Sequence, residues 1–163
     1  MGEVIVRSVK SGYAYVNQPE EQEARFRTGW LYIGDLATWD AEEYVTIVGR
    51  KDDMIISGGE NIHPTQVEGV LNEHPGIVES VVVGVPDEQW GELVVAYVVR
   101  ADPLDVAACE AHCHGHPMLA TYKRPRAYRF VEELPMTATG KKVHYQVRER
   151  AVRDAKAGLL ERP

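Results

Sequence analysis

Two long apolar runs in the middle of the chain constrain its fold most strongly. Residues 78–85 and 93–99 consist almost entirely of valine and other apolar residues, and only a short polar segment separates them. A strand with one face in water alternates apolar and polar residues, so continuous runs predict strands that are covered on both faces. We therefore expect these two strands to form the centre of a sheet.

The sequence around these runs predicts the helices that cover the sheet. Pro64 begins a segment in which Val67, Val70 and Leu71 share one side, as in the first turns of an amphipathic helix. Predicted helices cover residues 64–71, 104–114 and 145–159, and further strands cover residues 54–56 and 126–131. The earlier segments 3–9 and 44–48 are predicted to be short antiparallel strands. The fold class is therefore α+β: a small β subdomain over residues 1–51, then a domain over residues 52–163 with a small mixed sheet flanked by helices.

Composition narrows the classes of function. With 163 residues, 44% of them hydrophobic and 26% charged, the chain has ordinary globular composition. It has neither the roughly 20-residue apolar run of a membrane span nor a secretory signal at its start, which favours a cytoplasmic protein without a transmembrane segment. The net charge of −7 argues against a nucleic-acid partner. Residues 122–150, however, carry eight basic and three acidic side chains, a local excess of positive charge that suits a compact polyphosphate ligand.

Three motifs occur in a fixed order along the chain. They are Gly29-Trp30-Leu31-Tyr32-Ile33-Gly34-Asp35-Leu36, Gly49-Arg50-Lys51-Asp52-Asp53-Met54-Ile55-Ile56-Ser57-Gly58-Gly59-Glu60-Asn61 and Pro135-Met136-Thr137-Ala138-Thr139-Gly140-Lys141. This order resembles the C-terminal end of the adenylate-forming enzymes, which include acyl- and aryl-CoA ligases, luciferases and the adenylation domains of peptide synthetases. The likeness extends from Gly2 to about Arg148, and among these enzymes it is closest in type to fatty-acid and 4-chlorobenzoate CoA ligases.

The resemblance implies roles in nucleotide binding and domain movement. Asp35 matches the carboxylate that binds the ribose hydroxyls of ATP, although Ile33 replaces the threonine that usually stands two residues before it. Arg50 matches an arginine that binds the ribose or the phosphates. Asp52 matches the hinge about which the C-terminal domain turns between two half-reactions.

The resemblance also implies a CoA site and a catalytic lysine. Gly58 and Gly59 match a loop that lines the passage for the pantetheine arm of CoA, Trp90 matches an aromatic side chain that stacks on its adenine, and Arg124 and Arg126 match partners of its phosphates.

Lys141 matches the lysine that bridges the carboxylate and the ATP phosphate oxygens during adenylate formation. Beside it, Lys142 stands where relatives commonly carry an apolar residue, and His144-Tyr145 replaces a frequent basic pair.

The activity implied is the AMP-forming ligation of a carboxylic acid to CoA, with ATP, Mg²⁺ and CoA as substrates and cofactor. The phosphate loop, the acid pocket and the magnesium-binding acid of such enzymes lie in a large N-terminal domain, and this sequence contains none of them. We therefore expect the chain to be a C-terminal part of a longer ligase, inactive alone, with that domain as its partner. Two alternatives stay open: an adenylation domain or luciferase-like enzyme, and a non-catalytic module that binds CoA or a similar nucleotide.

A cluster of sulfur and imidazole side chains is a candidate metal site. Its members are Cys109, His112, Cys113, His114 and His116. Two cysteines and three histidines in eight residues contain the ligand types of zinc. The spacing also fits an ordinary helix with buried, reduced cysteines and exposed histidines, and we favour this interpretation, with no metal bound.

Overall fold

The chain forms two compact units. The computed structural model describes residues 1–9, 14–101 and 103–163, and these divide into a first unit, Met1–Asp52, and a second unit, Asp53–Pro163. The boundary between the two units lies one residue later in the sequence than expected. What each unit contributes to a larger enzyme stays a prediction.

The first unit is a small antiparallel sheet built around one long strand. Its elements are β1 (Gly2–Val6), α1 (Pro19–Arg25), β2 (Phe26–Arg27), β3 (Trp30–Trp39) and β4 (Val45–Arg50). The strands β1, β2 and β4 all pair with β3. The strands expected near residues 3–9 and 44–48 correspond to β1 and β4, but sequence analysis missed both β3 and α1. Strand β3 contains Gly34 and Asp35, two residues that are rare in strands, and so its sequence did not indicate a strand.

The second unit has a mixed sheet. In chain order its elements are β5 (Ile55–Ser57), β6 (Glu60–Ile62), α2 (Pro64–Asn72), β7 (Ile77–Asp87), β8 (Gly91–Arg100), α3 (Val106–Gly115), the 3₁₀ turn Thr121–Lys123, β9 (Ala127–Phe130) and α4 (His144–Lys156). The strand order is β6-β5-β8-β7, with antiparallel pairs, and β9 adds to β8 in parallel. A mixed sheet with helices confirms the predicted α+β fold class.

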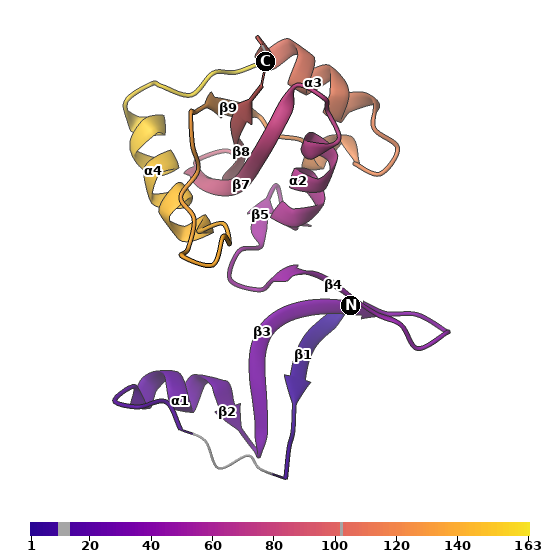
Figure 1. Ribbon diagram of the computed structural model, residues 1–163, viewed down its shortest axis with the longest axis vertical. Helices are drawn as coiled ribbons and strands as arrows, with labels where there is room; N and C mark the ends of the chain where they lie inside the picture. Colours follow the sequence, from indigo (N-terminus) through magenta and orange to yellow (C-terminus); the bar gives the residue numbers. More distant parts are fainter. Residues whose placement is uncertain (10–13, 102) are drawn as a thin grey trace. The chain divides into compact units, whose positions relative to one another are not determined.

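Helices cover both faces of the sheet of the second unit, as the two valine-rich runs predicted. On one face, Val82 and Val94 pack with α2 and α3. On the other face, Val81 and Val95 pack with α4. Figure 1 shows α2 and α4 on opposite sides of β7 and β8. Because β7 and β8 are buried on both faces, the unit has two core layers, and a polar side chain on an apolar helix face needs a partner there.

The cysteine and histidine cluster lies on and after α3. Cys109 and Cys113 are fully buried and unpaired, and burial raises the pKa of Cys109 to about 11 and that of Cys113 to about 12. His112 instead makes a 2.8 Å hydrogen bond to the Val70 carbonyl, and His116 makes a 2.9 Å bond to Glu73. In the described ranges of the chain, no three or more His, Cys, Asp or Glu side chains are arranged to hold a metal ion.

Among the residues that the structure describes, no helix has both the length and the apolar character needed to cross a bilayer.

Candidate functional site

The sheet register of the first unit brings together the two side chains expected to bind a nucleotide. Asp35 of β3 is the cross-strand partner of Arg50 at the end of β4. Arg50 Nη1 donates a 3.0 Å hydrogen bond to Asp35 Oδ1, and the side chains of Arg50 and Asp35 are 45% and 29% exposed. Both groups are therefore open to a ligand. Together they offer an acceptor for hydroxyl groups next to a planar cation for phosphate oxygens.

The surroundings of this pair keep it uncrowded. Gly34 has a φ of +78°, and a Cβ added there would lie 3.2 Å from Arg25 Nη1 and from Arg50 Nη2, so a larger residue would displace the guanidinium groups. Asp52, the expected hinge residue, lies 4.0 Å from Arg50 and is 71% exposed. A hollow of about 280 Å³ is lined by residues that include Gly34 and Asp52, but not by Asp35 or Arg50 themselves.

Two neighbouring turns of the second unit bring Gly58 and Trp90 into contact. The Gly58 N–H donates a 2.8 Å bond to the Trp90 carbonyl, and Ser57 pairs with Gly91. A Cβ on Gly58 would lie 3.1 Å from the Trp90 ring, and both Gly58 and Gly59 have positive φ angles. The indole therefore lies directly over glycine backbone, where any side chain would crowd it.

The turn before Trp90 holds the indole at the surface. Asp87 Oδ1 accepts 2.9 Å bonds from the backbone N–H groups of Gln89 and Trp90, which fixes the tip of the β7–β8 hairpin. Trp90 remains 44% exposed. A fixed and half-exposed indole is available for stacking on a flat ligand.

The two arginines expected to bind phosphates differ in their surroundings. Arg124 forms an ion pair with Glu110 and donates to the Thr121 carbonyl, and its side chain is only 15% exposed. Arg126 is partly exposed, and its side chain makes no hydrogen bond or ion pair within the part of the chain that the structure describes. Arg126 is therefore the more available of the two for an anionic ligand.

Lys141 lies on an exposed loop that closes on itself. Met136 and Lys142 form an antiparallel bridge, the Thr137 N–H donates a 2.7 Å bond to the Lys141 carbonyl, and Thr137 Oγ1 accepts a 3.0 Å bond from the Lys141 N–H. Gly140 has a φ of +77°, which a glycine adopts without strain. The ammonium group of Lys141 has no partner among residues 1–9, 14–101 and 103–163. We refer to residues 136–142 as the lysine loop.

Sequence analysis missed a cluster of charged side chains next to the lysine loop. Glu68 of α2 is only 6% exposed, and its Oε1 accepts 2.8 Å bonds from the Val82 N–H and from His144 Nε2. Lys142 Nζ lies 3.8 Å from Glu68 Oε2 and donates a 2.7 Å bond to the Ser80 carbonyl. The available signal was an acid on the apolar side of a predicted helix, next to Val67, since such an acid is rarely buried without a partner.

The hydrogen bond that His144 makes to the Glu68 carboxylate raises the pKa of His144 above its ordinary value of 6.5. The negative charge of Asp53 acts in the same direction, whereas burial and Lys142 act against it. The raised pKa favours an imidazolium next to the buried carboxylate.

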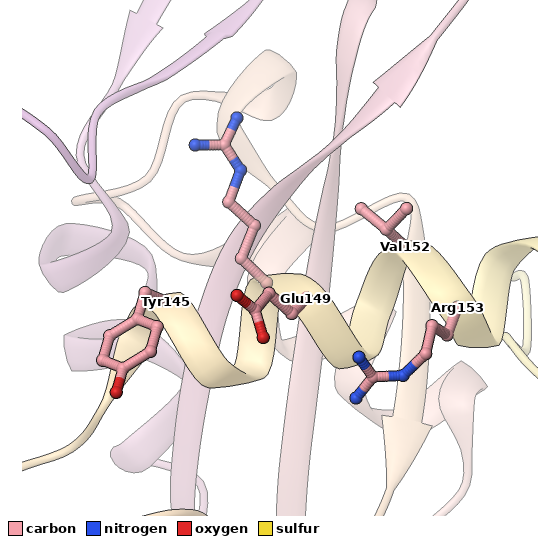
Figure 2. A pocket seen from close by; sticks show the side chains of 5 residues that line it. Tyr145, Glu149, Val152 and Arg153 are labelled. Carbon is pink, nitrogen blue, oxygen red and sulfur yellow. The ribbon is translucent and has the colours of Figure 1, made fainter.

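A second hollow, of about 460 Å³, lies along α4. It is lined by Tyr145, Arg148, Glu149, Val152 and Arg153. Figure 2 shows the labelled members of this group on successive turns of one helix. None of the residues predicted from the sequence to bind nucleotide or CoA lines this hollow, so it is not the candidate site.

Comparison with known proteins identifies the class. Residues 66–141 match the family model described as the AMP-binding enzyme C-terminal domain. The chain is 46% identical over 140 residues to a long-chain-fatty-acid–CoA ligase of Bacillus subtilis (strain 168), covering 86% of this chain and 25% of that protein.

Two solved structures resemble this chain in both sequence and fold. The o-succinylbenzoate CoA synthetase of Bacillus subtilis, in complex with an acyl-adenylate intermediate, matches with a TM-score of 0.82 and 37% identity over 90% of this chain and 30% of its own. The same enzyme in complex with ATP and a magnesium ion matches with a TM-score of 0.79 and 36% identity over 89% and 30% of the two chains.

The fold and the lysine loop thus define a C-terminal domain of the adenylate-forming type. Residues 66–141 of the chain match the C-terminal domain family of the AMP-binding enzymes, and the relatives that the chain resembles are acyl- and aryl-CoA ligases. The chain spans between 25% and 30% of the length of the two enzymes compared.

Proposed function

We propose that this chain is the C-terminal part of an AMP-forming acid–thiol ligase that makes an acyl adenylate from a carboxylic acid and ATP-Mg²⁺ and then transfers the acyl group to CoA. The observation that carries the proposal is Lys141: an unpaired ammonium group on a self-closed loop, at the end of a segment that matches the AMP-binding C-terminal domain. The names of the relatives, a fatty-acid CoA ligase and an acyl-adenylate-bound synthetase, support the reaction class.

In the first half-reaction, Lys141 places its positive charge between the attacking carboxylate and the α-phosphate. Negative charge builds up on the phosphate oxygens in the transition state, and a preorganised cation stabilises that charge more than it stabilises the separated reactants. Asp35 and Arg50 orient the nucleotide through its ribose and phosphates. The magnesium ion and the acid pocket belong to the partner N-terminal domain in this proposal.

In the second half-reaction, the second unit turns about Asp52 and presents its glycine turn to the adenylate. The pantetheine arm of CoA passes along the turn of Gly58 and Gly59, where a Cβ on Gly59 would meet nothing within 4 Å, while Trp90, next to Gly58, stacks on the adenine. Arg126, together with Arg124 when it is released from Glu110, neutralises the CoA phosphates.

The proposed location is the cytoplasm, where thiols stay reduced. Cys109 and Cys113 support this location, because both are buried as free thiols and not joined in a disulfide.

The test is ATP–pyrophosphate exchange by the full-length protein with fatty and aryl acids. We expect Lys141→Ala to reduce exchange by about a hundredfold or more, the size of losing one preorganised charge in a transition state. Lys156→Ala, which removes an exposed lysine at the end of α4, is the matched control and should leave exchange unchanged. Equal exchange by wild type and Lys141→Ala would exclude the proposed role of Lys141.

A non-catalytic CoA-binding module is the second candidate, and the exposed Trp90 next to Gly58 favours it over a purely structural domain. Calorimetry with CoA on wild type and Trp90→Ala measures this property separately. CoA binding without any pyrophosphate exchange would support the module and not the ligase.

A further inference from the structure

Backbone hydrogen bonds close the lysine loop locally and do not fix it to the rest of the second unit. The bonds between Thr137 and Lys141 join residues within the loop, and the bond from the Val143 N–H to the Pro135 carbonyl joins its two ends. Lys142 at the end of the loop and His144, two residues beyond it at the start of α4, both contact Glu68. These two side-chain contacts link the end of the lysine loop to α2.

Glu68 and Lys142 also satisfy backbone groups on the side of β7 that pairs with no strand. Strand β7 is the last strand of the sheet order, with β8 on one side only, so backbone groups on its other side need partners. The Val82 N–H donates to Glu68 Oε1, and the Ser80 carbonyl accepts from Lys142 Nζ. Glu68 is thus held in place by fixed backbone, and it offers the lysine loop an attachment point that cannot move freely.

We propose that Glu68 is a positioning residue for adenylate formation: through Lys142 and His144 it holds the lysine loop so that Lys141 is delivered in one place, and protonation of His144 sets how firmly it does so. This inference rests on the proposed function, because it assigns Lys141 its role in adenylate formation. It adds a control of that step by pH, and the control resides in Glu68, Lys142 and His144, none of which contacts substrate in the proposal.

The direction of the pH effect follows from the charges around His144. Glu68 from α2 and Asp53 raise its pKa above the ordinary 6.5, while Lys142 lowers it, and Glu79 of β7 lies 3.7 Å from Lys142 Nζ. A basic group whose pKa is raised in the folded state stabilises that state fully when the pH lies below the ordinary pKa of the group. The charge-assisted part of that stabilisation is lost as the pH rises through the raised pKa. The lysine loop should therefore be held most firmly at mildly acidic pH.

Hydrogen exchange in the full-length protein tests the attachment directly. The reporters are the backbone amides of Thr137, Gly140, Lys141 and Val143, compared as protection factors so that the intrinsic pH dependence of exchange is removed. In the wild type we expect protection to fall about tenfold between about pH 6 and about pH 9, the size of one charge-assisted hydrogen bond. A wild type with equal protection at both pH values would overturn the proposal.

Matched variants separate charge from shape. His144→Arg keeps a cation at all pH values and should give high protection without pH dependence, whereas His144→Gln and Glu68→Gln keep hydrogen-bonding groups of similar size and should give low protection throughout. His114→Gln, an exposed histidine of α3, is the control and should behave as wild type. Wild-type protection in Glu68→Gln would contradict the inference.

Pyrophosphate exchange then tests the consequence for catalysis. We expect the wild-type kcat to decline above the pKa of His144 with KM for ATP unchanged, and His144→Arg to remove that decline. If exchange is present but His144→Arg keeps the wild-type pH profile, the positioning role is refuted while the proposed function stands. If the wild type shows no pyrophosphate exchange with any acid, the proposed function and the catalytic part of this inference fail together. The hydrogen-exchange protection factors still decide whether Glu68 holds the lysine loop.

Discussion

The pairing of Asp35 with Arg50 shows how single side chains are poised for a ligand. Each satisfies the other across neighbouring strands, at 3.0 Å, while both stay partly exposed. An exposed ion pair contributes little to stability, so exchanging it for contacts with a ligand costs little. In the proposed function, the pair keeps both charges oriented before a nucleotide binds.

Removal of the Asp35 charge should therefore affect binding and not folding. We expect Asp35→Asn in the full-length protein to weaken ATP binding by about tenfold, because an amide is a weaker acceptor for ribose hydroxyls than a carboxylate. Titration calorimetry with a non-hydrolysable ATP analogue measures this change. Glu23→Gln, an exposed charge on α1, should leave affinity unchanged, and a loss of equal size there would point to net charge as the cause.

Gly58 should be difficult to replace, because both its positive φ and the Trp90 ring disfavour a side chain there. Gly58→Ala places a Cβ 3.1 Å from the Trp90 ring at a φ of +60°, which costs about 1–2 kcal/mol in backbone strain alone. We expect urea denaturation to show a loss of at least this size, together with a change in Trp90 fluorescence. An unchanged midpoint and an unchanged emission spectrum would contradict the contact between Gly58 and Trp90.

At the level of elements, helix α2 contains a glycine, Gly69, that should tolerate replacement by alanine, unlike Gly58. Gly69 lies on the exposed side of this helix, and nothing lies within 4 Å of a Cβ added there. We expect Gly69→Ala to raise the free energy of unfolding by about 0.5–1 kcal/mol, because alanine loses less backbone entropy in a helix than glycine does. The same urea experiment measures it, and a decrease would show that the space next to Gly69 is occupied.

Elements with a strong burial pattern could be predicted from the sequence, whereas those defined by their partners could not. The valine runs gave β7 and β8, and the apolar side of residues 64–71 gave α2. Strand β3 was missed because it is held by pairing with β1, β2 and β4 and not by its own composition. Helix α1 was missed because none of its residues is buried, so no apolar periodicity marks it.

For the candidate site, the sequence predicted individual residues, whereas the contacts between them appear only in the structure. Resemblance to a family supplied Asp35, Arg50 and Lys141, but only the register of β3 and β4 shows that the first two touch. Glu68 and His144 are 76 positions apart, and no local pattern indicates that contact. The availability of Arg126, compared with the partly buried ion pair of Arg124 with Glu110, also depends on tertiary structure.

At the scale of the whole molecule, Cys109 and Cys113 should report the unfolding of the second unit. Both are fully buried, and their pKa values are raised to about 11 and about 12. We expect almost no reaction with a thiol reagent at pH 8 in the native protein, and two thiols per chain in denaturant. Rapid labelling of the native protein at the rate of free cysteine would contradict this prediction.

The same raised pKa values predict how stability changes in alkali. Unfolded thiols ionise near the ordinary value of 9.0, while the buried thiols keep their protons to about pH 11. The native state binds more protons in this window, so the free energy of unfolding should fall with rising pH by about 1.4 kcal/mol per pH unit for each thiol. Urea denaturation between these pH values measures the slope, and Cys109→Ala should reduce it.

Strand β7 also bears on how copies of this protein behave toward one another. Its outer side is occupied by the carboxylate of Glu68 and the ammonium of Lys142, two side-chain groups that take the place of a neighbouring strand. When these hydrogen bonds break, the free edge of β7 can pair with β7 of a second molecule, as any unpaired edge strand of a sheet can. Self-association, followed by light scattering, should therefore increase with pH and protein concentration in parallel with release of the lysine loop.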